Sequence, residues 1–255
     1  MQQKFFYLKG TIMDKLYIII PAYNEEENIG KIVKEWHKVM EKVIAEGASS
    51  KSKLIVIDDG SKDSTYAIME ELARKELAYF LPITKPNSGH GATVLYGYKY
   101  AIKKGADYIF QTDSDGQTVS QEFYEFWNLR KDYDMVIGAR KHREDGYSRI
   151  LVTKVLKLVI RLCFHTNVED ANTPFRLMKA DTLKKYIRMM PKDFNLSNVL
   201  ISVIFTKANA QIKYIPITFR PRQGGVNSIN IKSITKIGIQ AVRDFRRINK
   251  RLKSL

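Results

Sequence analysis

A single cysteine, Cys163, is present among the 255 residues. One cysteine cannot close an internal disulfide, which excludes a disulfide-stabilised scaffold and is compatible with a reducing compartment. Long apolar runs are also missing, because the run 16–20 is soon broken by Pro21 and no run approaches the ~20 residues of a membrane-spanning helix. Residues 1–14 have no apolar core of the length that a signal peptide needs. We therefore expect a cytoplasmic protein.

Acidic residues are too few to balance the basic ones. The chain has 43 Lys and Arg against 27 Asp and Glu, for a net charge of +16. Such a field favours polyanions, namely nucleic acid, anionic lipid or phosphorylated substrates. A nucleic-acid-binding protein is thus the non-enzymatic alternative. We do not expect a nucleic-acid partner, because the chain has no zinc-finger spacing, no RNP-like aromatic motif and no recognisable helix-turn-helix pair.

No internal repeat or low-complexity linker divides the chain. Short β-branched runs, the first ended by Pro21, alternate with amphipathic segments in the first half. Strands are predicted at 16–20, 53–57, 79–83 and 107–112, and helices at 25–45 (capped by Asn24), 64–75 and 92–103. Further helices are predicted at 121–130, 148–164 and 197–207, and strands at 135–138, 173–178 and 211–219. This order predicts an α/β fold with a mostly parallel, Rossmann-like sheet flanked by helices.

The strongest functional signal follows the strand predicted at 107–112. The strand runs into Asp113-Ser114-Asp115, and Gln117 lies two residues beyond. Open α/β sheets bind ligands at the carboxyl ends of their strands. Two carboxylates and an amide oxygen suit Mg²⁺ or Mn²⁺ with positions left for phosphate oxygens. An acidic turn is the alternative, since Asp-x-Asp-Gly is also good turn chemistry.

Polar turns also follow the three earlier strands. Together they resemble the inverting nucleotide-sugar glycosyltransferases of family 2. The matching motifs are Ile20-Pro21-Ala22-Tyr23-Asn24-Glu25, Asp58-Asp59-Gly60-Ser61, Asn87-Ser88-Gly89-His90-Gly91 and Asp113-Ser114-Asp115-Gly116-Gln117. The branch with dolichyl-phosphate mannosyltransferases and bacterial polyprenyl-phosphate glycosyltransferases is indicated by Gly138-Ala139-Arg140, residues 170–176 and Arg222-Gln223-Gly224-Gly225. The resemblance implies a GT-A fold and metal-dependent transfer of a sugar to a polyprenyl phosphate.

The resemblance also implies roles for individual residues. The nucleotide would be held by Pro21, Tyr23, Glu25, Ile57 and Asp59. The ribose and diphosphate would lie against Asp113, Ser114 and Asp115, with Asp115 and Gln117 as ligands of Mg²⁺ or Mn²⁺. The donor would be a UDP- or GDP-linked sugar. His90 is better explained as a structural loop histidine than as a base.

The acceptor of this branch is a phosphate monoester, which is anionic and needs no general base. By position in their motifs, the residues expected to contact it are Arg140, Arg149, Thr153 and Arg222. A saccharide hydroxyl would instead need a base, for which Glu169-Asp170 is the best candidate, with Asp170 preferred.

Each group of candidates also has an ordinary explanation. Arg140, Arg149 and Arg222 could be solvated surface arginines. Asp59 could be a helix cap or turn residue, and residues 87–91 an ordinary glycine-rich turn.

The chain departs from the family pattern at two places. The loop that begins at Arg222 lacks the lysine that often follows Arg-x-x-Gly-x-Ser in this branch, and the family's Gly-Phe-Arg pattern reads Pro174-Phe175-Arg176 here.

A metal-assisted nucleotidyltransferase on a similar sheet is the competing enzyme class. Such an enzyme is expected to have a glycine-rich phosphate loop with a lysine near the N-terminus, and residues 21–27 are unlike that loop.

The predicted organisation is a lead-in (1–15), a transferase domain (16–231) and a basic amphipathic helix (232–255). Residues 16–117 would bind the nucleotide sugar and 118–231 the acceptor. Basic amphipathic helices fit peripheral attachment to an anionic membrane, on the inner face of the cell membrane. Packing of the same apolar stripes on the core is the alternative.

Overall fold

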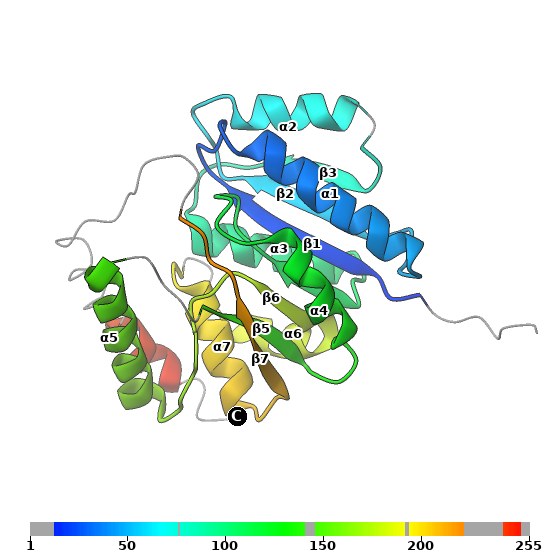
Figure 1. Cartoon of the computed structure of the whole chain (residues 1–255). Coiled ribbons are helices and arrows are strands. Elements are labelled where there is room, and N and C mark those ends of the chain that lie inside the picture. The colour runs from blue at the N-terminus through cyan, green and yellow to red at the C-terminus, as the bar shows by residue number, and fades with distance from the viewer. Residues whose placement is uncertain (1–12, 76, 141–145, 192–193, 222–241, 251–255) are drawn as a thin grey trace, which may run out of the picture.

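The computed structural model describes residues 13–75, 77–140, 146–191, 194–221 and 242–250, with the backbone alone for 146–152. A seven-stranded sheet in the order β3-β2-β1-β4-β6-β5-β7 runs through the molecule (Figure 1). Its strands are β1 (Leu16–Ala22), β2 (Lys53–Asp58), β3 (Phe80–Thr84), β4 (Tyr108–Gln111), β5 (Met135–Arg140), β6 (Arg176–Lys179) and β7 (Ile212–Ile217). The predicted α/β fold with a mostly parallel sheet is confirmed.

Helices cover both faces of the sheet (Figure 1). One face carries α1 (Ile29–Ala45), α2 (Thr65–Arg74) and α4 (Phe123–Asn128), which follows the short 3₁₀ turn η1 (Ser120–Glu122). The other carries α3 (His90–Lys103), α6 (Ala180–Tyr186), the 3₁₀ turn η2 (Ile187–Met189) and α7 (Ser197–Lys207), with the inner side of α5 (Gly146–Phe164). Burial on both faces explains why the central strands read as unbroken apolar runs.

Strand β6 runs against its neighbours. It is antiparallel to both β4 and β5, whereas the other strand pairs of the described sheet are parallel. The N–H of Gly138 in β5 donates to the carbonyl of Phe175, just before β6, at 2.8 Å. The chain therefore leaves the sheet after β5 and returns to it at the same place.

Proline 21 does not end the first strand as predicted. β1 continues to Ala22, and Pro21 is paired with Ile57 of β2. The carbonyl of Ile19 accepts from Thr112 N–H, so the backbone groups of Ile19 face the β4 side. Pro21 lies two residues later on the same strand, so its backbone groups face that side as well. Because β4 has ended there, the missing N–H of proline costs no ladder hydrogen bond.

The first helix begins four residues later than predicted. Asn24 has φ of 51°, in the left-handed region, and does not cap the helix. Its N–H donates to Ser61 Oγ at 2.9 Å, and its Oδ1 accepts from the N–H of Lys62 at 2.9 Å. The segment after β1 thus binds the turn after β2 because asparagine tolerates positive φ and can bond through both its backbone and its side chain.

In the second half of the chain, the strand predicted to begin at residue 173 begins at Arg176 as β6. Helix α6, which follows it, was not predicted.

The predicted C-terminal helix lies largely outside the described residues. The described segment 242–250 is helical, and Phe245 and Ile248 are buried in the core. The ring of Phe245 lies 5.1 Å from that of Phe164 in α5 and 5.9 Å from that of Phe194. These apolar residues of the C-terminal segment therefore pack on the core of the protein, which was the alternative to membrane attachment. Within the described ranges, no helix combines the length and apolar character that crossing a membrane requires.

Candidate active site

The carboxyl ends of four parallel strands meet at one edge of the sheet. The register pairs Ala22 with Asp58 and Asp58 with Thr84, so the segments after β1, β2 and β3 begin side by side. β4 ends at Gln111, level with Ile19 of β1, and the Asp-x-Asp segment follows there. The structure therefore brings together the first three polar turns and the acidic pair, as predicted.

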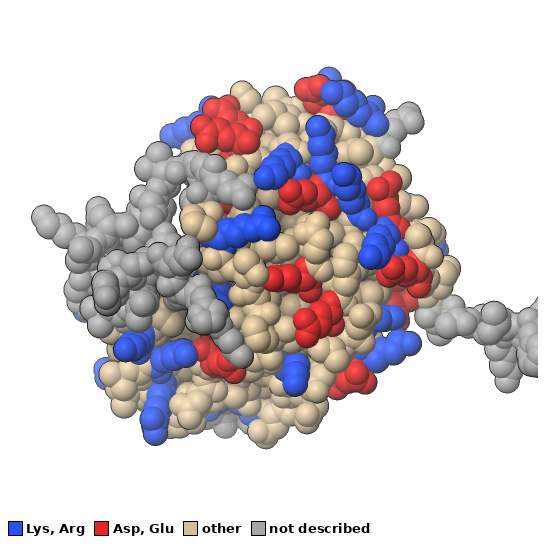
Figure 2. All heavy atoms as spheres, viewed as in Figure 1, with Lys and Arg blue, Asp and Glu red and all other residues tan. Residues whose placement is uncertain are grey.

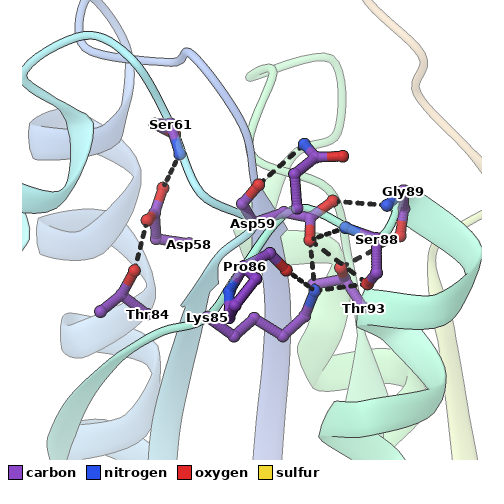
Figure 3. Close-up of polar contacts among 10 residues, drawn as sticks. Asp58, Asp59, Ser61, Thr84, Lys85, Pro86, Ser88, Gly89 and Thr93 are labelled. Atoms are coloured by element: carbon purple, nitrogen blue, oxygen red, sulfur yellow. Dashed lines mark hydrogen bonds and ion pairs between the residues drawn. The ribbon is translucent and has the colours of Figure 1, made fainter.

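Asp59, just after β2, is surrounded by donors from the β3–α3 loop (Figure 3). Its Oδ1 pairs with Lys85 Nζ and accepts from Ser88 N–H at 2.9 Å, while Oδ2 accepts from Gly89 N–H at 2.8 Å. The side-chain amide of Asn87 donates to the Asp59 carbonyl at 2.8 Å. The carboxylate expected to hold the nucleotide thus also ties β2 to the loop that opens α3.

The charge of Asp59 is itself stabilised by these contacts. Burial alone would raise the pKa of this carboxyl, but hydrogen bonds from Lys85, Ser88 and Thr93 hold its pKa below the ordinary value. Such a group stabilises the fold fully above its unfolded-state pKa of about 4, and the contribution is lost as the pH falls through the lower folded-state pKa. Asp59 is therefore predicted to make stability fall in acid.

Replacing Asp59 with asparagine is expected to lower the free energy of unfolding by about 3 kcal/mol at neutral pH, because Lys85 loses its buried partner. The gap in free energy of unfolding between variant and wild type should narrow as the pH falls below about 4, because the wild-type carboxyl then takes up a proton on unfolding. Urea unfolding followed by circular dichroism measures both effects. Asp132→Asn, an exposed acid, is the matched control. A gap of constant size across this pH range would contradict the prediction.

Tyr23 and Glu25 follow β1 at the same edge. The Tyr23 side chain is 43 % exposed, so a ring is presented at the surface next to the Asp59 turn. Glu25 is buried, where its Oε2 accepts from Asn28 Nδ2 at 3.0 Å and its N–H donates to Thr65 Oγ1 at 2.8 Å. A flat ring beside fixed carboxylates is an arrangement that can hold a nucleoside.

His90 contacts the first acid of the Asp-x-Asp pair. Its Nε2 lies 3.0 Å from Asp113 Oδ1. Desolvation lowers the pKa of His90, but the carboxylates of Asp113, Asp115 and Asp59 outweigh it and raise the pKa above its ordinary value. The sequence favoured a structural role for this histidine. The sequence shows only that His90 lies between two glycines. This position does not reveal that α3 begins close enough to the end of β4 for His90 to reach Asp113.

Asp115 and Gln117 lie in one tight turn. Asp115 Oδ1 accepts from the N–H of Gln117 at 3.1 Å, and Gly116 between them has φ of 71°. Gln117 Nε2 donates to the carbonyl of Arg220 at 2.9 Å, which leaves Oε1 as the end of this amide that could bind a metal ion. Neighbouring Ser114 is buried. The turn thus offers hard oxygen donors at the edge of the sheet.

The described residues contain no cluster of three or more His, Cys, Asp or Glu that could hold a metal ion. This small donor set fits Mg²⁺ or Mn²⁺ bound by one or two protein oxygens together with substrate phosphates, rather than in a closed protein cage. The residues present therefore fit a divalent ion that arrives with a diphosphate.

Arg140 and Asp170 form a two-pronged ion pair. Arg140 Nε lies 2.8 Å from Asp170 Oδ2, and an outer nitrogen of the same guanidinium lies 2.7 Å from Oδ1. Their side chains are only 9 % and 10 % exposed, and the guanidinium also lies 5.0 Å from the centre of the Phe219 ring. Both oxygens of the candidate base are thus occupied by a cation, which makes Asp170 a poor proton acceptor.

The remaining acceptor candidates are only partly placed. Thr153 is half-buried in α5, the backbone of Arg149 lies one turn before it, and Arg222 lies outside the described residues. The structure adds Arg176, which is fully buried and was not predicted as a site residue. Arg176 donates to the carbonyls of Ala171 at 3.2 Å and of Thr173, so it holds the turn that begins at Asp170.

Gly91 has no room for a side chain. A Cβ there would lie 2.2 Å from the carbonyl oxygen of Phe194 and 2.6 Å from that of Asn195. Gly91→Ala is therefore expected to lower the free energy of unfolding by about 1–3 kcal/mol, measured by urea unfolding. Gly30→Ala is the matched control, since its Cβ would make an ordinary contact with Ile68 at 3.6 Å. Equal losses in both variants would contradict the assignment of this motif glycine to packing.

The model of the Glycosyl transferase family 2 matches residues 17–187. The chain belongs to glycosyl transferase family 2. It is 25 % identical over 226 residues to polyprenol monophosphomannose synthase of Mycolicibacterium smegmatis. That alignment covers 85 % of this chain and 82 % of the synthase. It is 31 % identical over 193 residues to UDP-N-acetylglucosamine–dolichyl-phosphate N-acetylglucosaminyltransferase of Methanococcus voltae, covering 67 % and 72 %. The predicted family and branch are confirmed.

Solved structures share the fold of this chain. Glucosyl-3-phosphoglycerate synthase from Mycobacterium tuberculosis, in complex with Mn²⁺, UDP-glucose and phosphoglyceric acid, aligns with a TM-score of 0.65 at 15 % identity. The alignment covers 93 % of this glycosyltransferase and 80 % of that chain. This likeness confirms the GT-A type of fold.

Proposed function

We propose that this glycosyltransferase moves a sugar, with inversion, from a nucleotide-diphosphate sugar to a polyprenyl phosphate. The observation that favours a phosphate acceptor is the ion pair between Arg140 and Asp170. A saccharide hydroxyl needs a base, and Asp170, the acid preferred for that role, is bound through both oxygens by an arginine. A phosphate is already anionic and needs a cation to orient it. Relatives named for polyprenol and dolichyl-phosphate reactions support the same acceptor class.

The donor would bind across the ends of β1, β2 and β4. We assign the nucleoside to Tyr23, Glu25 and Asp59, with Pro21 and Ile57 forming the floor beneath it. Tyr23 is exposed and can stack on a base, whereas buried Glu25 and Asp59 offer fixed acceptors for base N–H or ribose hydroxyl groups. The base is uracil or guanine, because UDP- and GDP-linked sugars are the donor classes implied by the family.

The diphosphate would lie against the Asp-x-Asp turn. In this proposal Asp113 and Ser114 would contact the ribose and diphosphate, and Asp115 with Gln117 Oε1 would hold Mg²⁺ or Mn²⁺. When bound, the ion supplies Lewis-acid stabilisation of the charge that grows on the leaving diphosphate. His90 holds Asp113 through one oxygen and thereby orients the turn. The protein itself chiefly positions the reactants.

On the acceptor side, Arg140 is the central contact. Its guanidinium is oriented by Asp170 and by the Phe219 ring, so little side-chain entropy remains to be lost on binding a phosphate. Arg149, Thr153 and Arg222 would complete the phosphate site. The lipid chain of such an acceptor resides in a membrane, so the reaction would take place at a membrane surface.

A product assay tests the proposal. The purified chain is incubated with Mn²⁺, a panel of UDP- and GDP-linked sugars, and either a short-chain prenyl phosphate or simple saccharides. We expect one donor to yield a glycosyl prenyl phosphate, identified by mass spectrometry, with inversion shown by NMR. Transfer to a saccharide but not to the prenyl phosphate would overturn the proposed acceptor.

A further inference from the structure

Helix α5 exposes a row of large apolar side chains. Val155, Leu158 and Leu162 are 50 %, 56 % and 66 % exposed. At about 3.6 residues per turn, these three fall within an arc of about 60° on the helix. The other exposed large apolar side chains of the described residues are scattered: Met13, Tyr23 and Tyr96. A row of this kind marks an interaction surface, whereas single exposed apolar residues do not.

The row is not part of the core that the described residues form. α5 packs on the protein through a different side, where Ile160, Cys163 and Phe164 are buried. Phe164 lies against Phe245 with ring centroids 5.1 Å apart. The helix therefore has two apolar sides, one that joins the core and one that faces outward. Loss of the outward side chains should leave the core intact.

Basic side chains border the outward row. Lys154, Lys157 and Arg161 are exposed and fall on an adjoining strip of the helix. No Asp or Glu occurs in the sequence of α5. In Figure 1, α5 lies at the lower left beside the segment 242–250, and Figure 2 shows Lys and Arg atoms next to uncharged atoms in that region, with acidic atoms at its border. Apolar and basic groups thus share one outer face, made of these three residues with Val155, Leu158 and Leu162.

We propose that this outer face of α5 docks the protein on an anionic lipid bilayer. The apolar row would enter the headgroup and acyl boundary, and the basic strip would meet lipid phosphates. This inference rests on the proposed function, because it names the surface from which a lipid phosphate would be reached. Thr153, a candidate acceptor contact, lies one turn before Lys157 on the same helix.

A second copy of the chain fits this face less well. In a symmetric dimer the same patch meets itself, so both basic strips would lie together without an acid on α5 to balance them. Lipid phosphates provide the charge that this face lacks. The charge complementarity therefore favours the bilayer.

Vesicle flotation tests the docking face. Wild type is expected to float with vesicles of equal parts phosphatidylglycerol and phosphatidylcholine at low salt, and not with phosphatidylcholine alone. The triple variant Val155→Ser, Leu158→Ser, Leu162→Ser should reduce the bound fraction at least about tenfold. Tyr96→Ser, at an exposed position of α3, is the matched control and should float like wild type. A wild type that stays unbound, or an unaffected triple variant, would overturn the proposal.

Two further measurements separate this inference from the proposed function. Transfer to a water-soluble short-chain prenyl phosphate, without vesicles, should be the same in wild type and the triple variant. Transfer without flotation would overturn the docking face alone, and flotation without any transfer would overturn the proposed function alone. Light scattering adds the remaining test. A wild-type dimer that the triple variant dissociates would assign the face to a second copy and overturn the bilayer.

Discussion

Replacing Asp115 with asparagine is expected to lower kcat by about 10³-fold or more. The change removes the one carboxylate assigned to the metal ion, and stabilisation of a developing diphosphate charge is worth several kcal/mol. The fold should be retained, because asparagine can still accept the hydrogen bond from Gln117 N–H through its side-chain oxygen. The rate is measured as glycosyl prenyl phosphate formed at saturating donor.

Calorimetric titration shows whether the loss arises at the donor site. Wild type should bind either UDP or GDP more tightly with Mn²⁺ than without it, and Asp115→Asn should lose this dependence. Asp132→Asn, which changes an exposed acid, is the matched control and should behave as wild type. Metal-independent binding in wild type would remove the metal from the proposal. Failure of both nucleotides to bind would direct attention to the basic surface and to nucleic acid.

Replacing Arg140 with lysine is expected to lower kcat/KM for the prenyl phosphate by about 10²-fold and to leave KM for the nucleotide sugar unchanged. Lysine keeps a positive charge beside Asp170, so the buried acid stays paired. It lacks the planar fork that can hold a carboxylate and a phosphate in fixed positions. Steady-state rates with each substrate varied in turn measure the two constants. Arg247→Lys, in the exposed pair with Asp244, is the matched control.

The companion variant Asp170→Asn distinguishes the two acceptor classes. With a phosphate acceptor, transfer should persist at roughly a tenth of the wild-type rate or more, because no proton needs to be removed. A general base at this position would instead make the loss about 10²–10⁴-fold. A loss of that size, with normal folding and nucleotide binding, would restore Asp170 as the base and a hydroxyl as the acceptor.

Much of the donor half could be predicted from the sequence. β1, β2 and β4 are buried on both faces, which produces short β-branched runs that periodicity detects. Their polar turns necessarily meet, since parallel strands end at the same edge. The start of α1 could not be predicted in this way. It depends on Asn24 binding the turn after β2, a contact across 37 and 38 positions of sequence.

The acceptor half was harder to predict because its contacts depend on β6. Arg140 and Asp170 were both chosen as candidates, but for competing roles. Their pairing follows from the antiparallel placement of β6 beside β5, which periodicity does not reveal. Likewise, the contact of His90 with Asp113 depends on where α3 begins relative to β4.

The meeting of β5 and β6 has a consequence for how this protein can diversify. The hydrogen bond from Gly138 to Phe175 closes the base of a long excursion that contains α5 and the Asp170 turn. Because the segment between β5 and β6 leaves and rejoins the sheet at one point, its length and sequence can change while β1, β2 and β4 keep their register. The entropic cost of a longer closed loop rises only with the logarithm of its length. Changes of acceptor can therefore be concentrated in this segment, provided that the side of α5 that packs on Phe245 is kept.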